Sequence, residues 1–259
     1  MSGSPMPILQ IEHLTLVQPN WTVSHKVKAF CTTRLSGRSE GVYDSFNLAT
    51  HVDDDVAAVQ ANRQTLKETL NLPSKPFWLD QQHTTVAVAF SEELSAQKPV
   101  ADAAWTQKKG QVLTVMTADC LPIILADHDA SIVVAIHAGW RGLAEGVIEK
   151  TLAKLPVKPE SLQAWIGPAI SQRFFEVGGE VLDAFVEKRV ATLDFFKQSE
   201  SDSSKYFADL PNLADFILRE CGVREVSFSG LCSYDQPELF YSYRRDGETG
   251  RMATLIWLD

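Results

Sequence analysis

The chain has 259 residues, of which 45 % are hydrophobic, enough for the core of one large domain or two small ones. Its 24 Lys and Arg against 33 Asp and Glu give a formal net charge of −9 without any basic block, which argues against nucleic acid or an anionic membrane as the main partner. No run approaches the roughly 20 apolar residues of a membrane span, and the N-terminus lacks the pattern of a secretory signal, so we expect a cytoplasmic protein.

The N-terminal part of the chain predicts two strands and one helix. Residues 21–34 alternate apolar and polar side chains, as in a half-buried strand. Asp55 precedes apolar residues at three- and four-residue steps, which predicts a helix up to residue 72. A second strand is expected around residues 86–88. Residues 91–110 show no strong period and are expected to form a long surface loop.

Short apolar runs and helical stripes alternate in the rest of the chain. The predicted strands lie at residues 112–116, 122–126, 132–136, 162–170, 225–232, 239–245 and 252–258. The predicted helices lie at residues 141–155, 178–190 and 210–222, and a polar loop is expected at 197–205. Because there is no internal repeat and no clear linker, we expect one mixed α/β domain spanning residues 1–259.

Two apolar runs between residues 117 and 142 are joined by a polar pair, His128 and Asp129, which predicts a β-hairpin. With the turn centred on that pair, Cys120 faces His137 on one side of the hairpin, with Cβ atoms about 4.5–5.5 Å apart. Pro122 cannot donate to the ladder, so the pairing near Cys120 is expected to be loose or at an edge. A thiolate and an imidazole at this spacing can share a proton or a metal ion.

Two chemical interpretations of this pair stay open. The cysteine and histidine are either a nucleophile with its base or two ligands of a metal ion that needs a third. His83, a polar residue at the edge of a predicted strand, is the natural third candidate, although other histidines have similar local claims. The four cysteines lie far apart in a chain too large to need disulfides, so reduced thiols are expected.

Glycines open the predicted helix that follows the hairpin. Gly139 and Gly142 flank Trp140 and Arg141. The free N–H groups and the dipole at the start of a helix favour an anion, so a phosphate could bind there.

Eight motifs follow one another between about residues 30 and 251: TTRLSGRSEGVYDSFNLATHVDDD, NR at 62 and 63, WLDQQH, TADCLPIILAD, VAIHAGWRG, IGPAIS, FFEVGGEV and FYSYRRDGETGR. Together they resemble the bacterial laccase-domain family. Its members are described as multicopper polyphenol oxidases and as purine nucleoside phosphorylases with adenosine deaminase activity, and also as peptidoglycan editing factors.

The resemblance implies a four-layer α/β/β/α fold and a metal site, usually taken as zinc, with His83, Cys120 and His137 as ligands. Three protein ligands leave one tetrahedral position open, which is typical of a catalytic zinc site. Copper is the alternative metal, since thiolate and imidazole also bind it tightly. The chain departs from the family pattern at Gln82 and Thr84, beside one of these ligands, without removing any of the three.

The function implied is phosphorolysis of adenosine, inosine and S-methyl-5′-thioadenosine, together with zinc-dependent deamination of adenosine. Deamination needs an activated water and a carboxyl group that shuttles protons. The candidate shuttle is Asp119, which could equally be an anchor beside the ligand Cys120. Together with Cys120 and His137 it forms the expected catalytic set.

Phosphorolysis needs cationic or N–H donors for phosphate and groups that bind the nucleoside. Four arginines of the motifs are candidates for these roles, Arg34, Arg141, Arg244 and Arg245, and of these Arg34, Arg141 and Arg245 are the expected substrate-binding residues. Asn47 is expected to bind ribose or base. Tyr43, Phe46 and Trp140 are the aromatic residues that could stack on a purine, or simply pack.

Three other functions compete with this one. Polyphenol oxidation would need copper, but the sequence lacks the repeated His-x-His pairs that a trinuclear copper cluster requires. A metal-free hydrolase could use Cys120 as nucleophile and His137 as base on an amide of a peptidoglycan precursor. A non-enzymatic zinc module would need more than three ligands. The expected partners are nucleosides and phosphate, and a monomer is favoured.

Overall fold

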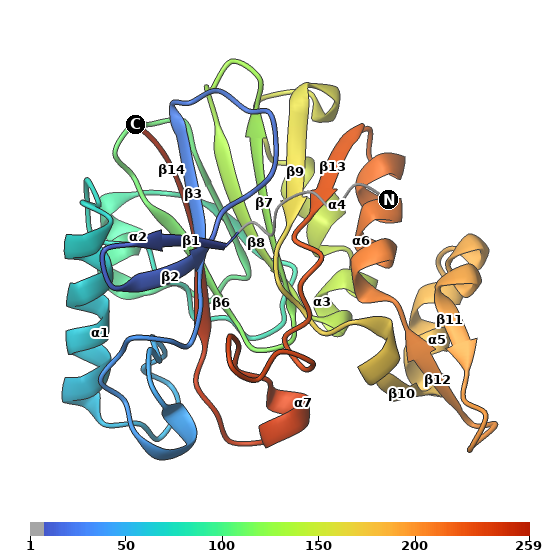
Figure 1. Ribbon diagram of the computed structural model, residues 1–259. Coiled ribbons are helices and arrows are strands. Elements are labelled where there is room, and N and C mark those ends of the chain that lie inside the picture. The colour runs from blue at the N-terminus through green and yellow to red at the C-terminus, as the bar shows by residue number, and fades with distance from the viewer. Residues whose placement is uncertain (1–7) are drawn as a thin grey trace.

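Two large sheets packed face to face form the centre of the protein, as the computed structural model, which describes residues 8–259, shows in Figure 1. The first sheet is antiparallel, with the order β1 (Ile8–Ile11), β2 (Leu14–Val17), β3 (Val27–Thr32), β14 (Met252–Leu258) and β6 (Leu113–Thr117). The second is mixed, with the order β13 (Glu225–Phe228), β9 (Leu162–Ile166), β7 (Leu121–Asp127), β8 (Val133–Ala138), β5 (Ala103–Thr106) and β4 (Ala87–Ala89).

Helices cover the outer faces of both sheets. Helix α1 (Val56–Thr69) packs on the first sheet. Helices α3 (Trp140–Glu145), α4 (Val147–Leu152) and α6 (Leu210–Glu220) pack on the second. Successive strand residues point to opposite faces, so Ile123 of β7 packs with the helices while Ile124 packs between the sheets. The mixed α/β fold and its four layers, α/β/β/α, are therefore confirmed.

The chain between β9 and α6 forms a small third sheet outside these layers, at the lower right of Figure 1. Its order is β10 (Glu176–Gly178), β12 (Lys205–Ala208) and β11 (Phe196–Gln198), and α5 (Gly179–Val186) follows β10. The remaining helices are α2 (Glu92–Gln97), α7 (Tyr243–Asp246) and the 3₁₀ turns η1 (Gly41–Tyr43), η2 (Pro159–Ser161), η3 (Gln172–Phe174) and η4 (Val190–Phe195).

Two predicted helices are confirmed, the first with its predicted start and the second with its predicted stop. Asp55 accepts a hydrogen bond from the Ala58 N–H at the start of α1. Asp209 caps α6 in the same way, and Gly222, with φ of 100°, follows shortly after its end. The strands expected in residues 112–136 and 252–258 are also confirmed as β6, β7, β8 and β14.

Several predicted boundaries are wrong. Residues 91–110 are not a loop, because Ser91 caps α2 and the buried residues 103–106 pair as β5. The helix expected at 141–155 is split at Gly146, which has φ of 95°. No strand forms at 239–245, where residues 243–245 instead belong to α7, whose cap is Ser242. The strand expected at 21–34 is only β3, and the polar segment 197–205 borders β11 and β12.

The central hairpin forms, but its register differs from the prediction by two residues. Pro122, not Cys120, lies opposite His137, and Cys120 immediately precedes β7. The turn is displaced because the Asp127 carboxylate accepts hydrogen bonds from the N–H groups of Ser131 and Ile132. A shift of two residues leaves the same side chains on each face, so the cysteine still lies near the histidine.

The described part of the chain contains no helix that is both long and apolar enough to cross a membrane. The expectation about a secretory signal falls partly on residues 1–7, which lie outside the described residues.

Candidate metal centre

Three side chains from separate segments meet at the end of the central hairpin. The ligand atoms of His83, Cys120 and His137 all lie within 4.8 Å of one another. His83 lies in the loop before β4, Cys120 directly before β7, and His137 in β8. Since His83 is exposed and His137 is only 4 % exposed, the cluster is held from inside and open to solvent on one side.

The arrangement fits a tetrahedral ion. The Cys120 Sγ and the His83 Nε2 are 3.5 Å apart. Zinc bonds of about 2.0 Å to nitrogen and 2.3 Å to sulfur would separate two tetrahedral ligands by about 3.5 Å. The Nδ1 of His137 is bonded to Asp102, at 2.7 Å, which leaves its Nε2 as the ligand atom.

Because Gly139 has no side chain, the cluster has room beside it. A Cβ at this position would lie 2.3 Å from the Cδ2 of His83 and 3.1 Å from the Cys120 Sγ. Its φ of −69° is ordinary, so the glycine is required for space and not for backbone conformation. The expected glycine-bearing entry to a helix therefore packs against two of the candidate ligands, and α3 behind it is only six residues long.

Cys120 and His137 shift each other's titration. Burial raises the pKa of the Cys120 thiol, but the charge of His137 and hydrogen bonds from both histidines outweigh it and lower the pKa to about 6. Burial lowers the pKa of His137, but the Cys120 thiolate and Asp102 outweigh it and raise it. Without a metal ion, both shifts favour the charged forms of the pair, a thiolate beside an imidazolium.

Asp119, next to Cys120 in the chain, is hydrogen-bonded through its carboxylate to the C-terminal segment. Its carboxylate accepts hydrogen bonds from the hydroxyls of Ser233 and Ser242, at 2.6 and 3.0 Å, and from the Arg244 N–H at 2.7 Å. It has φ of 92° and is only 8 % exposed. These contacts favour the anchor among the two roles considered for it.

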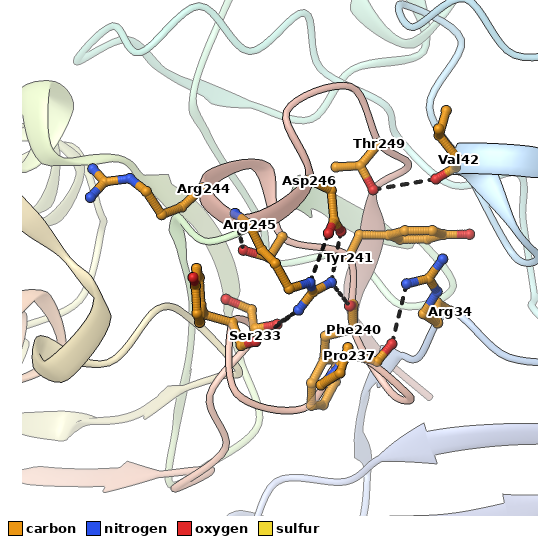
Figure 2. Close-up of polar contacts among 12 residues, drawn as sticks. Arg34, Val42, Ser233, Pro237, Phe240, Tyr241, Arg244, Arg245, Asp246 and Thr249 are labelled. Carbon is orange, nitrogen blue, oxygen red and sulfur yellow. Dashed lines mark hydrogen bonds and ion pairs between the residues drawn. The ribbon is translucent and has the colours of Figure 1, made fainter.

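Figure 2 shows that Arg245 is held entirely by the protein. Its guanidinium makes two bonds to the Asp246 carboxylate and three to the carbonyls of Ser233, Tyr234 and Phe240. Because a guanidinium has five N–H donors, none is left for a substrate. Arg245 thus holds the loop at 233–240 in place.

Two other expected substrate residues are also engaged. Arg34 donates to the carbonyls of Asp44 and Pro237, and its guanidinium lies 4.7 Å from the centre of the Tyr241 ring (Figure 2). Asn47 is fully buried, donates to Asp54 and accepts from the N–H groups of Ala49 and Arg251. Both residues therefore brace the segment around η1 by the contacts described.

Arg141 and Arg244 are more accessible. Arg141 is exposed, stacks 4.2 Å above the Trp140 ring, and has no hydrogen-bond partner among residues 8–259. Arg244 is exposed and donates to the Glu176 carbonyl. Among the aromatic candidates, Phe46 is buried in the core beside α1, so it packs and does not face a ligand.

Sequence reasoning missed two residues near the centre, Asp102 and Arg251. Asp102 lies in the segment expected to be a loop. Arg251 is part of the FYSYRRDGETGR motif, and burial lowers its pKa although the negative charges of Cys120 and Asp119 raise it. Only one of its guanidinium nitrogens, Nη1, donates to protein acceptors, the carbonyls of Thr249 and Gly250. The motif was a signal for Arg251, whereas Asp102 had none.

All four cysteines are free. Cys31 is fully buried between the sheets, and burial raises its pKa to about 12. Cys120 is therefore chemically distinct from the core cysteine that an isolated cysteine usually represents.

Fold and site together define a class of protein: a four-layer α/β scaffold whose central hairpin carries an open cluster of two histidines and a cysteine. Residues 28–259 match the family described as multi-copper polyphenol oxidoreductase laccase, and the chain belongs to that family. The resemblance inferred from the eight motifs is thereby confirmed.

Relatives from several bacteria extend over almost the whole chain. A protein of Pseudomonas aeruginosa named purine nucleoside phosphorylase is 44 % identical over 240 residues, which cover 93 % of this chain and 97 % of the relative. The purine nucleoside phosphorylase YfiH of Escherichia coli is 43 % identical over 243 residues, covering 94 % and 98 %.

Two solved structures have the same fold as this chain. The crystal structure of a Neisseria meningitidis protein of the DUF152 family superposes with a TM-score of 0.88 at 42 % identity, covering 94 % of this chain and 99 % of the other. The crystal structure of YlmD from Geobacillus stearothermophilus gives 0.89 at 27 % identity, covering 98 % and 99 %.

Proposed function

We propose that the protein is a purine nucleoside phosphorylase acting on adenosine, inosine and S-methyl-5′-thioadenosine, and that it also deaminates adenosine when zinc is bound. The observation that carries the proposal is the open cluster of His83, Cys120 and His137, held by a buried carboxylate. The names of the relatives support a nucleoside and phosphate as substrates.

Zinc fits the three donors better than a set of copper ions does. Within residues 8–259, one group of three or more His, Cys, Asp and Glu side chains is close enough to hold a metal ion. A multicopper oxidase needs several such groups, so we propose one zinc ion and treat copper as an adventitious occupant of the same ligands. When bound, zinc supplies the Lewis acidity that makes water nucleophilic near neutral pH, as deamination requires.

Two arginines are proposed to bind phosphate. Arg141 is proposed because its guanidinium is exposed and unbonded among the described residues, at the helix entry directly after Gly139. Arg251 is proposed because the negative charge of Cys120 acts on its guanidinium, and because its Nε and Nη2 donate to no other described residue. Arginine suits this role because its planar fork binds phosphate oxygens in pairs. Arg34, Asn47 and Arg245 would then shape the substrate site from behind.

The test is product analysis by mass spectrometry for adenosine incubated with and without phosphate. We expect adenine and ribose 1-phosphate only when phosphate is present, and inosine in both mixtures. Arg141→Ala should raise the KM for phosphate, whereas Arg173→Ala, on an exposed arginine that also stacks on an aromatic ring, should not. Adenosine unchanged by protein loaded with zinc would contradict the proposal.

A second candidate function is supported by one further observation. Cys120, His137 and Asp102 form a chain of thiolate, imidazole and carboxylate, the arrangement of a cysteine hydrolase. In that reaction the sulfur would attack an amide carbonyl of a peptidoglycan precursor, His137 would protonate the leaving amine, and water would hydrolyse the thioester. Amide cleavage that survives chelation, with a trapped thioester, would favour this function.

We also propose that the chain acts as a monomer of one domain in the cytoplasm. Sedimentation at micromolar concentration tests the first part, and a mass near 28.7 kDa is the expected result.

A further inference from the structure

One buried carboxylate, Asp102, connects the two histidines of the metal centre. Its Oδ1 accepts hydrogen bonds from the Nδ1 of His137, at 2.7 Å, and from the backbone N–H of His83, at 3.1 Å. Its Oδ2 accepts from the N–H and the hydroxyl of Thr84, at 2.6 and 2.7 Å. Asp102 is the residue directly before β5, and it is fully buried.

The backbone of Asp102 makes further connections to the same segments. Its carbonyl accepts from the His137 N–H at 2.7 Å, and its own N–H donates to the Val86 carbonyl at 3.0 Å. The loop at 82–86 is therefore attached to residue 102 both through the side chain and through the main chain. His137 is attached in both ways as well.

The loop that carries His83 needs such support. His83 has φ of 59°, a left-handed conformation that residues other than glycine adopt rarely and at a cost. The N–H groups of Gln82, His83 and Thr84 all point at the Asp102 carboxylate, the first at 3.4 Å. A carboxylate that accepts from consecutive N–H groups stabilises the conformation that brings them together.

We propose that Asp102 is the positioning residue of the metal centre: it fixes His83 and His137 in the geometry that binds the metal, and it fixes the tautomer of His137 that presents Nε2. The inference rests on the metal site of the proposed function but not on its substrates. An asparagine at 102 would place an NH₂ group against N–H or O–H donors on one side or the other. With the NH₂ group in place of Oδ1, His137 and the His83 N–H would both lose their acceptor. With it in place of Oδ2, Thr84, in the loop that carries His83, would lose its acceptor.

Asp127 provides a matched control at the other end of the same hairpin. It is also an aspartate, is 4 % exposed, and accepts three hydrogen bonds, from the N–H and hydroxyl of Ser131 and from the Ile132 N–H. It supports a turn and makes no described contact with the metal centre. Asp127→Asn should therefore disturb the fold in a similar way without acting on the ligands.

The experiment measures Zn²⁺ affinity by competition with a chromophoric chelator, for the wild-type chain, Asp102→Asn and Asp127→Asn. We expect Asp102→Asn to weaken Zn²⁺ binding by roughly 10–100-fold, the usual effect of losing a carboxylate behind a ligating histidine. Asp127→Asn should bind like the wild type. With Co²⁺ as the probe, Asp102→Asn should keep the thiolate charge-transfer band of Cys120 and alter the ligand-field bands.

Wild-type Zn²⁺ affinity in Asp102→Asn would overturn the inference, and so would an equal loss in both variants. If Asp102→Asn does not fold, Thr84→Val decides, because it removes one hydrogen bond to Asp102 and leaves the ligands intact. A smaller loss of affinity is then expected, and no loss overturns the inference. Because no turnover is measured, absence of phosphorylase activity would defeat the proposed function without affecting this result.

Discussion

Two buried aspartates lie near the candidate metal centre, Asp102 through its contacts and Asp119 as the neighbour of Cys120, and their hydrogen-bond partners differ. Asp102 contacts both histidines, through one side chain and one backbone N–H. Asp119 is the chain neighbour of Cys120, yet its carboxylate contacts Ser233, Ser242 and the backbone of Arg244. The first carboxylate fixes the ligands, and the second fixes the C-terminal segment that carries the arginines.

The comparison shows that a carboxylate next to a ligand in the sequence need not support that ligand in the structure. Asp119 stands beside Cys120 in sequence, but its oxygens are occupied by donors from residues 233–244. Asp102 is distant in sequence from all three ligands, yet it is hydrogen-bonded to two of them, His83 and His137. Changes on the Asp102 side should therefore affect metal binding, and changes on the Asp119 side should affect stability and substrate binding.

The largest effect is expected at Cys120, the ligand whose chain neighbour is Asp119. Cys120→Ala removes the thiolate ligand, so the protein should lose its zinc and more than about 100-fold in phosphorolysis rate. The fold should persist, because Cys120 is not part of a core cluster. Zinc content and adenosine turnover measured on one preparation check this. Cys31→Ala, in the core, should keep its zinc, and its failure to do so would contradict the assignment.

The next largest contrast concerns thiol reactivity in protein stripped of metal. The pKa of Cys120 is lowered to about 6 and that of Cys31 is raised to about 12. Because the thiolate is the reactive form and appears as pH rises through the pKa, iodoacetamide should modify Cys120 with a half-maximal rate near pH 6 and leave Cys31 unmodified at pH 8. Peptide mass spectrometry across pH 5–8 measures this. Equal labelling of both cysteines would show that His137 does not stabilise the thiolate.

A smaller loss is expected on the Asp102 side from Gly139→Ala. The added methyl would lie 2.3 Å from the His83 ring, so His83 must move, and Zn²⁺ affinity should fall by about 10-fold or more. Gly179→Ala is the control, because a Cβ there meets nothing within 4 Å. Competition with a chelator measures both. Unchanged affinity in Gly139→Ala would place His83 outside the ligand set.

The smallest effect is expected on the Asp119 side. Asp119→Asn keeps a residue that tolerates φ of 92° but puts an NH₂ group against hydrogen-bond donors, so the free energy of unfolding should fall by about 1.5–3 kcal/mol. Zinc content should stay at the wild-type level. Urea denaturation and metal analysis test both statements. Full stability with abolished deamination would instead show that Asp119 shuttles protons.

The sequence predicted that Cys120 and His137 lie close together, and this prediction holds even though the predicted hairpin register does not. The hairpin register was wrong by two residues, but strand faces repeat every two residues, so the two side chains still meet. His83 was a candidate from its place at the edge of a predicted strand, but only the resemblance selected it among the histidines. Its local conformation, with φ of 59°, is imposed by Asp102 and has no signal in the chain pattern.

Other elements depended on contacts that distant residues supply. The segment 91–110 lacks a strong period, yet β5 forms because it is buried between β8 and β4. The apolar residues around Tyr241 suggested a strand, but α7 forms where Ser242 accepts from the Arg245 N–H and Asp119 accepts from the Arg244 N–H. Helix α1 was predictable because its cap and its stripe are local.

The most direct test of the central claim is the dependence of turnover on zinc. Protein stripped with a chelator should show no phosphorolysis or deamination of adenosine, and adding Zn²⁺ should restore both activities in proportion to the metal bound, up to one ion per chain. Adenosine turnover that persists unchanged in the stripped protein would contradict a metal-dependent enzyme, and amide cleavage by the stripped protein that requires Cys120 would support the cysteine hydrolase.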